Sequence, residues 1–142
     1  MFVITESRQQ LTLNWISGDI QEPLNQNSIK PLYSYIQVNG LKNSYSQFSD
    51  YSILSRAKTL HITDCLLDLS KIQGQFNYIN LVNCECVNDF INCKSEDLNV
   101  YHSKISIEQI LTLNVSNQFT YQEIDNKQYY HQKVKQQGNQ QI

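Results

Sequence analysis

The sequence predicts an α/β-type repeat solenoid, with a short-stranded parallel β-sheet on one side and irregular or short helical returns on the other. The first observation is a repeated pattern, because LHITDC at residues 60–65 returns as INLVNC at residues 79–84. The second is a series of short apolar alternations that begin at residues 11, 36, 60, 79, 98 and 111. These intervals are too short for a strand followed by a full helix, so they fit one strand and one compact return per repeat.

Alternation within each predicted strand separates a buried face from an exposed one. In LHITDC, Leu60 and Ile62 are two residues apart and point to one face, whereas His61 and Thr63 point to the other. Stacking of successive repeats predicts two apolar columns, one of Leu60, Ile79 and Leu98 and one of Ile62, Leu81 and Val100. A substitution of Asn80, on the opposite face, is expected to cost little stability.

Composition limits the class of protein. A chain of 142 residues with 40% hydrophobic residues can bury a core of its own. A mean hydropathy of -0.47 and the absence of a long apolar run predict no membrane-spanning segment. A net charge of -2 provides no basic field for a nucleic acid. The charge and the hydropathy therefore lead us to expect neither nucleic acid nor membrane as a partner. Because the first residues lack the pattern of a signal peptide, we also expect a cytoplasmic protein.

Two units fit a longer pattern of five apolar or small positions. These are filled by Ala57, Leu60, Ile62, Cys65 and Leu67 in one unit, and by Phe76, Ile79, Leu81, Cys84 and Cys86 in the next. A third unit has Leu98, Val100 and Ile105, but Ser95 and Ser103 stand at its first and fourth positions. A unit near Ile36 has Val38 and Leu41, and its outer positions are occupied by Tyr33 and Asn43. The chain therefore resembles leucine-rich repeat proteins over residues 11–116. The resemblance implies stacked coils with the parallel sheet on a concave face.

This resemblance divides the chain into three parts. Residues 1–10 are an N-terminal flank, residues 11–119 are the leucine-rich repeat array, and residues 120–142 are a Gln-rich C-terminal tail that we expect to be partly disordered. Lysines without accompanying acids after Asp125 leave open a second interpretation of the tail, in which it becomes ordered on contact with a partner.

The cysteines have one favoured interpretation and two alternatives. Cys65 and Cys84 stand where the repeat pattern places a small residue inside the coil, which favours buried, reduced thiols. A zinc site would use Cys84, Cys86 and Cys93, with Cys65 or His61 as a further ligand, but the cysteine spacing differs from that of paired zinc knuckles. A disulfide between stacked coils fits the distance that a bridge needs, although parallel side chains and a cytoplasmic location oppose it. We expect no metal and no cofactor.

Catalytic motifs are missing from the chain. It contains no GxSxG elbow, phosphate-binding GxxxxGK[ST] loop, HExxH helix or GxGxxG fingerprint. A dyad of Cys86 or Cys93 with His102 would require partners that meet only in space. The sequence predicts that the protein is not an enzyme.

The outward face of the predicted sheet is the candidate binding surface. Its expected columns are Gln37, His61, Asn80, Asn99 and Thr112, and Asn39, Thr63, Val82, Tyr101 and Asn114. The predicted partner-binding residues are Tyr35, Gln37, Asn39, His61, Thr63, Asp64, Tyr78, Asn80, Asn83, Asn99, Tyr101 and His102. Tyrosines on a neutral polar face suit a protein or peptide, so we predict a non-catalytic protein–protein interaction module. The alternative is a structural or spacer fragment of a longer repeat protein without its own ligand site.

Overall fold

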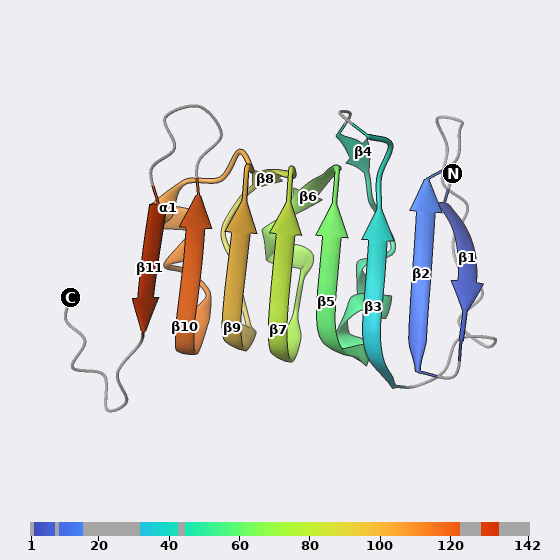
Figure 1. Ribbon diagram of the computed structural model, residues 1–142, viewed down its shortest axis with the longest axis horizontal. Coiled ribbons are helices and arrows are strands. Elements are labelled where there is room, and N and C mark those ends of the chain that lie inside the picture. The colour runs from blue at the N-terminus through green and yellow to red at the C-terminus, as the bar shows by residue number, and fades with distance from the viewer. Residues whose placement is uncertain (1, 8, 16–31, 43–44, 123–128, 134–142) are drawn as a thin grey trace.

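The protein is mostly parallel β-sheet with few helices, as the computed structural model shows for residues 2–7, 9–15, 32–42, 45–122 and 129–133 (Figure 1). The large sheet contains, in spatial order, β1 (Phe2–Glu6), β2 (Gln10–Trp15), β3 (Tyr33–Asn39), β5 (Ala57–Thr63), β7 (Gly74–Val82), β9 (Cys93–Tyr101), β10 (Asn114–Gln122) and β11 (Tyr129–Lys133). The small sheet contains β4 (Ser46–Gln47), β6 (Cys65–Asp68) and β8 (Glu85–Val87). No helix among these residues has the length and apolar character to span a membrane.

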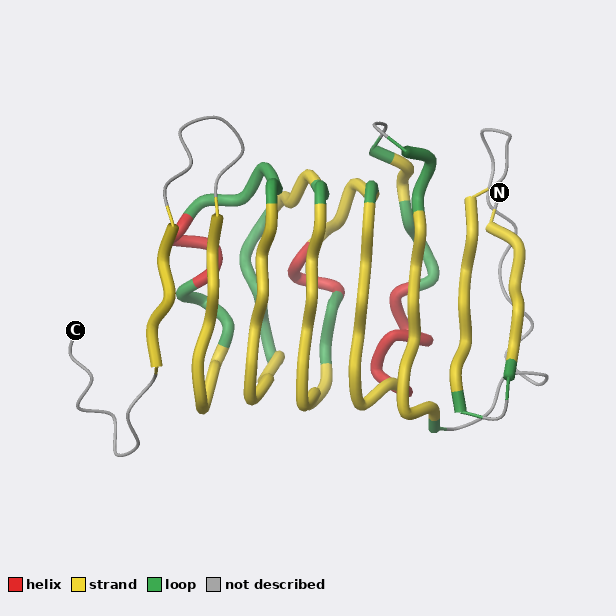
Figure 2. The backbone as a smooth tube through the Cα atoms, in the orientation of Figure 1, coloured by secondary structure: helices red, strands yellow, loops and turns green. Residues whose placement is uncertain are grey.

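Strand order in the large sheet follows the order of the chain. Neighbouring strands from β2 to β10 are parallel, whereas β1 and β11 pair antiparallel with β2 and β10 at the two ends. The described connections lie together on one side of the large sheet (Figure 2). They contain the small sheet and three short helices, which are η2 (Tyr51–Arg56), η3 (Leu69–Lys71) and α1 (Ile107–Ile110).

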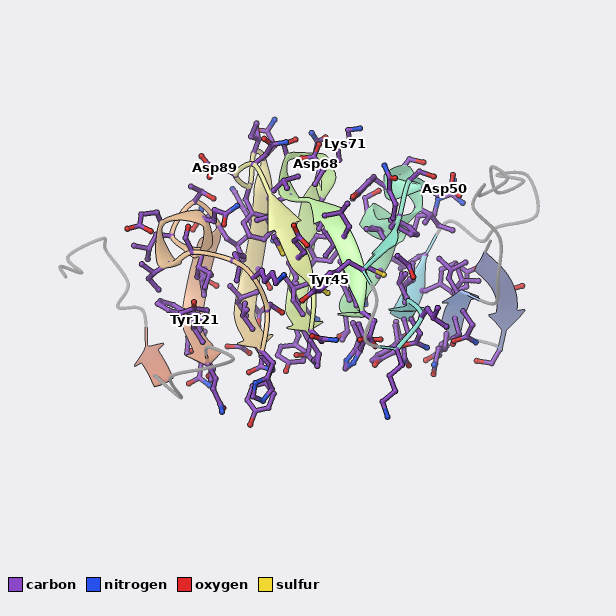
Figure 3. All side chains as sticks on the ribbon, turned by 90° about the horizontal axis from the view of Figure 1, so that it is seen from above. Tyr45, Asp50, Asp68, Lys71, Asp89 and Tyr121 are labelled. Carbon is purple, nitrogen blue, oxygen red and sulfur yellow. The ribbon has the colours of Figure 1, made fainter. Side chains whose placement is uncertain are left out.

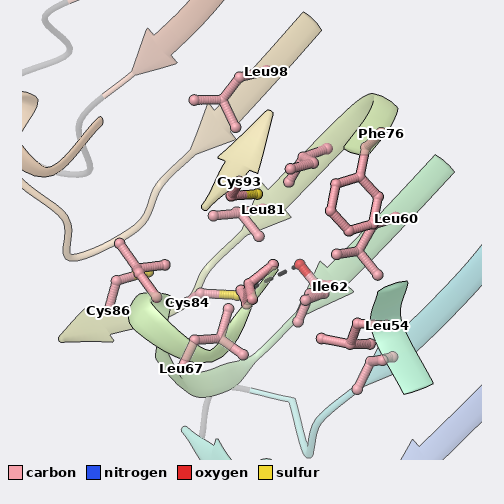
Figure 4. Close-up of a cluster of buried hydrophobic side chains, with 14 of the residues drawn as sticks. Leu54, Leu60, Ile62, Leu67, Phe76, Leu81, Cys84, Cys86, Cys93 and Leu98 are labelled. Carbon is pink, nitrogen blue, oxygen red and sulfur yellow. Dashed lines mark hydrogen bonds between the residues drawn. The ribbon is translucent and has the colours of Figure 1, made fainter. Parts of the chain in front are cut away.

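The register of the central strands confirms the two predicted apolar columns. Leu60 pairs with Ile79 and Ile79 with Leu98, while Leu81 stands between Ile62 and Val100. The same columns continue outward to Leu11, Leu13, Ile36, Val38, Phe119 and Tyr121. All of these side chains are buried. Figure 4 shows how Leu67 and Leu54 of the connections close the core against the sheet.

A sharp turn ends each central strand and sends the chain into the small sheet. Asp64, Asn83 and His102 occupy it with φ of 57°, 52° and 50°. Gly40 follows β3 at the matching place, and its N–H donates to the Thr63 carbonyl at 2.7 Å. A Cβ on Gly40 would lie 1.9 Å from the backbone oxygen of Asp64, so only glycine fits there.

Small side chains fill the inside of these turns, as the repeat pattern predicts. Cys65 and Cys84 are fully buried, and the thiol of Cys84 donates to the Ile62 carbonyl at 3.4 Å (Figure 4). Ser103, which departs from the repeat pattern, is buried at the next matching place. Its hydroxyl accepts from the Cys84 N–H and donates to the Tyr101 carbonyl, both at 3.0 Å. The Ser103 hydroxyl therefore both accepts from and donates to the backbone of the turn, whereas the Cys84 thiol only donates, to the carbonyls of Ile62 and Val82.

The prediction that a strand begins at Leu111 is wrong. Leu111 is 64% exposed and ends a helical turn, while β10 begins at Asn114 and aligns Phe119 with Leu98. The cause is a capping box in which the Ser106 hydroxyl accepts from the Gln109 N–H, while the Gln109 side chain accepts from the Ser106 N–H. This turn of α1 lengthens the connection, so Thr120 and Gln122 take the column positions expected for Thr112 and Asn114.

The flanking segments also carry strands. Residues 1–10 include all of β1 and the start of β2, and the expected boundary after residue 119 lies inside β10. Five residues of the expected tail form β11, which pairs with β10 from Gln118 to Gln122. The remainder of the tail, at residues 123–128 and 134–142, lies outside the described residues, as does Asn43.

Candidate functional site

The face of the large sheet that points away from the connections is called the open face here. Its side chains form three rows across the strands. The first row is Gln10, Tyr35, Thr59, Tyr78, Asp97 and Gln118; the second is Thr12, Gln37, His61, Asn80, Asn99 and Thr120; the third is Asn14, Asn39, Thr63, Val82, Tyr101 and Gln122. The rows exist because alternate residues of each strand point outward and the parallel register aligns equivalent positions.

Hydrogen bonds join three side chains of the second row across three strands. Asn99 Nδ2 donates to Asn80 Oδ1 at 2.6 Å, and Asn80 Nδ2 lies 2.8 Å from His61 Nδ1. Asn80 is only 9% exposed, because its neighbours cover it on both sides. The amide was expected to stand free on the surface, so its burial is a correction. This connected set is called the His61 row below.

A second network is centred on Asn39 in the third row. Asn39 Oδ1 accepts from Gln37 Nε2 at 2.9 Å and from Thr63 Oγ1 at 3.1 Å. Asn39 Nδ2 donates to Asn14 Oδ1 at 2.8 Å. Asn39 therefore links β2, β3 and β5 through side chains in addition to their backbone ladders, which fixes its orientation.

Aromatic side chains border these amides. The Tyr35 ring stacks beside His61 with centroids 6.3 Å apart, and Tyr78 is half-buried in the same first row. Burial raises the pKa of both Tyr35 and Tyr78, so both phenols stay neutral and can donate hydrogen bonds. Tyr101 is 38% exposed and rests edge-on against His102, with ring centroids 4.7 Å apart.

The turn residues flank the open face at the carboxyl ends of the strands. Asn83 Nδ2 donates to Asp64 Oδ1 at 2.5 Å, which joins the turns after β5 and β7. His102 occupies the next turn beside Tyr101. Asp64, Asn83 and His102 thus extend the open face as a polar border.

The structure brings most of the predicted partner-binding residues together on this face. Thr63, Val82 and Tyr101 follow one another in the third row, in the order of the expected column. Residues of the rows that the predicted partner-binding set lacks are Gln10, Thr12, Asn14, Thr59, Asp97, Gln118, Thr120 and Gln122, besides the apolar Val82. The alternation of Phe119 and Tyr121 is the signal that would have identified Thr120 and Gln122 as outward residues.

Charge is distributed unequally between the two sides of the sheet. Asp97 is the one carboxylate in the three rows of described side chains, and these rows contain no lysine or arginine. Burial lowers the pKa of His61 below its ordinary value of 6.5, so His61 is neutral at pH 7. Asp50, Asp68, Lys71 and Asp89 lie on the side of the connections (Figure 3). The three rows are therefore nearly uncharged.

Metal-binding and nucleophilic groups do not converge on the open face. Among the described residues, no three His, Cys, Asp or Glu side chains are grouped to hold a metal ion. The four cysteines are free and buried, and burial raises the pKa of Cys84 and of Cys93 to about 12. A thiol with such a pKa is not a thiolate at neutral pH, so it is a poor nucleophile.

A groove lies away from the open face. It has a volume of about 490 Å³ beside α1 and β10, and it is lined by Lys104, Ile105, Ser106, Ile107, Glu108, Gln109 and Tyr121. It contains none of the predicted site residues.

Comparison of this chain with protein-family models, with curated proteins and with solved structures finds no match.

Proposed function

We propose that this chain is a non-catalytic interaction module of the leucine-rich repeat type, and that it binds a protein or peptide through the open face. The observation that carries the proposal is the set of cross-linked side chains on that face. Side-chain hydrogen bonds connect His61, Asn80 and Asn99, and others connect Asn39 to Asn14 and Thr63. The side chains of the face are therefore ordered in the free protein. A preordered surface loses little side-chain entropy on binding.

The chemistry of the face favours a partner with few charges. Amides, hydroxyls and tyrosines dominate, and Asp97 is the one carboxylate of the rows. Tyrosine adds apolar contact area and a hydrogen-bonding group, and it is enriched in protein interfaces. We therefore propose an uncharged polar segment of a protein as the partner.

The repeat type of the module is supported by the spacing of the aligned strands. Register places Leu11, Ile36, Leu60, Ile79, Leu98 and Phe119 in one column. Each member follows the previous one by a strand and a compact connection, as in an array that buries its apolar face by stacking.

Binding is tested with Tyr101→Ala, because Tyr101 is exposed on the open face and its ring lies against His102. The control is Gln73→Ala, which changes an exposed side chain in the connection before β7. A partner isolated by pull-down with the intact chain should bind Tyr101→Ala about tenfold or more weakly, since interface energy concentrates in a few aromatic residues. Its affinity for Gln73→Ala should be unchanged, and the measurement is isothermal titration calorimetry.

A loss of affinity in Gln73→Ala without one in Tyr101→Ala would place the binding surface on the connections. That result would contradict the proposal.

A second candidate function is a structural spacer within a longer repeat protein. It is favoured by the burial of Asn80, whose amide is occupied by its own neighbours. A spacer requires no ligand on the open face, so pull-downs with the intact chain and with Tyr101→Ala would then recover the same proteins in the same amounts.

A further inference from the structure

The His61 row contains one titratable group whose protonation state dictates the direction of every hydrogen bond in the row. Asn80 Nδ2 lies 2.8 Å from His61 Nδ1. An amide nitrogen only donates, so the imidazole must accept at Nδ1 and carry its proton on Nε2. Asn80 Oδ1 is then directed at Asn99 and accepts from Asn99 Nδ2 at 2.6 Å.

Protonation of His61 is incompatible with this arrangement. An imidazolium carries hydrogen on both nitrogens, so its Nδ1–H would face the N–H of Asn80. Asn80 is only 9% exposed, so its amide has little access to water as a substitute partner. A buried donor that faces a donor is costly, whereas rotation of the Asn80 amide restores the hydrogen bond.

Rotation of Asn80 forces rotation of Asn99. Once Asn80 Oδ1 accepts from His61, Asn80 Nδ2 points at Asn99, which must then present its own oxygen. The outer atom of Asn99 changes from Oδ1 to Nδ2 as a result. Asn99 is half-buried on the open face, and no described residue hydrogen-bonds to its outer oxygen. A partner therefore meets an acceptor in one state and a donor in the other.

We propose that the His61 row is a proton-linked specificity element, in which neutral His61 makes Asn99 select a hydrogen-bond donor of the partner and protonated His61 makes it select an acceptor. This selection rests on the function proposed above. The reversal of the row is a property of the free protein.

The surroundings of His61 make it the group that governs the row. On β3 the titratable neighbour is Tyr35, which stacks on the ring; on β7 it is Tyr78, with Asp97 beyond it on β9. Lys58 and Asp64 stand near the two ends of β5. Burial is the cause that lowers the pKa of His61, so the transition falls below pH 6.5.

The Asn39 network is an internal control. It lies on the same face and is also built of amides, yet its hydrogen-bond partners are Gln37, Thr63 and Asn14, none of which titrates. Its amides should keep their orientation while the His61 row reverses.

The test is an NMR titration of the free, isotopically labelled protein from pH 8 to pH 4.5. At pH 8, His61 should be the Nε2–H tautomer. The side-chain amide signals of Asn80 and Asn99 should shift with a single midpoint shared with His61 and lying below 6.5, and those of Asn39 should not shift with it. An Nδ1–H tautomer at pH 8, or titration of His61 without a response from Asn80 and Asn99, overturns the proposal.

Two variants test the causal order. His61→Gln should abolish the pH response of Asn80 and Asn99. If His61→Gln does not fold, Asn99→Ser leaves the imidazole and Asn80 in place, and these two should still share a midpoint. Independent midpoints in Asn99→Ser overturn the proposal.

The effect of the row on partner binding is tested by measuring affinity at two pH values. A peptide that binds the open face at pH 7.5 should bind about tenfold more weakly at pH 5, because a donor then meets a donor. His61→Gln should remove this pH dependence. If the row reverses but the peptide binds with equal affinity at both pH values, the proposed selection of hydrogen-bond donor or acceptor is overturned. The NMR titration tests the reversal itself, and its result does not depend on whether the proposed function is correct.

Discussion

Single side chains of the open face contribute to stability. Asn80 is the clearest case, since its amide bonds to both neighbours and its side chain is 9% exposed. The alternation of β7 identifies Asn80 as an outward residue, but sequence alone does not reveal that its neighbours cover it. Whether an outward amide is buried depends on which side chains the register places beside it.

Asn80→Ala is expected to destabilise the protein by about 1–3 kcal/mol, because it removes partners from His61 and Asn99 in a partly buried row. This replaces the expectation that the substitution costs little. The matched control is Asn77→Ala, an exposed asparagine of the same strand, which should change stability by less than about 0.5 kcal/mol. Urea denaturation of both variants measures the difference, and equal effects would refute the energetic role of the row.

Each cysteine has a thiol that is buried in the native protein. Burial raises the pKa of Cys84 and Cys93 to about 12, and it raises those of Cys65 and Cys86 as well. At pH 8 all four should stay protonated and react slowly with iodoacetamide until urea unfolds the chain. Mass spectrometry of the alkylated protein measures this. Rapid labelling of any one thiol under native conditions, or zinc copurifying in stoichiometric amount, would contradict the prediction.

Individual strands were predictable where the two-residue alternation is unambiguous. In β5, β7 and β9 the apolar residues assign both the inner face and the register, and the structure confirms both. Alternation did not identify the structure at Leu111, because LTLNV alternates like a strand and the capping residues Ser106 and Gln109 precede it in the sequence. Local hydrogen bonding determined the element there, so hydrophobic periodicity alone could not place β10.

Ser106→Ala should destabilise the protein by about 0.5–2 kcal/mol, because it removes the side-chain acceptor that caps the first turn of α1. The capped turn also positions Gln109, whose Nε2 donates to the Asn88 carbonyl at 2.8 Å and so ties α1 to the preceding connection. Ser116→Ala, at an exposed position of β10, is the control and should have little effect. Thermal denaturation compares them; indistinguishable melting temperatures would mean that the cap does not determine this connection.

Across the whole molecule, the large sheet and its connections share one core made of aligned columns. Each interior column member contacts one neighbour on either side, so the effect of a substitution depends on its place in the column. Leu81 lies between Ile62 and Val100 and is fully buried. The sequence predicted this stack but also placed Leu111 in a strand, whereas Leu111 is 64% exposed.

The same substitution at these two leucines therefore tests the register of the whole sheet. Leu81→Ala should lower the free energy of unfolding by about 2–5 kcal/mol, because the lost side chain leaves a cavity between two fixed neighbours. Leu111→Ala should change it by less than about 0.5 kcal/mol, since the side chain already contacts water. Urea denaturation measures both. Equal losses of unfolding free energy would mean that Leu111 lies in the core and that the last parallel strand begins there. A large loss for Leu81→Ala alone supports the alignment of Phe119 in β10 with Leu98 in β9.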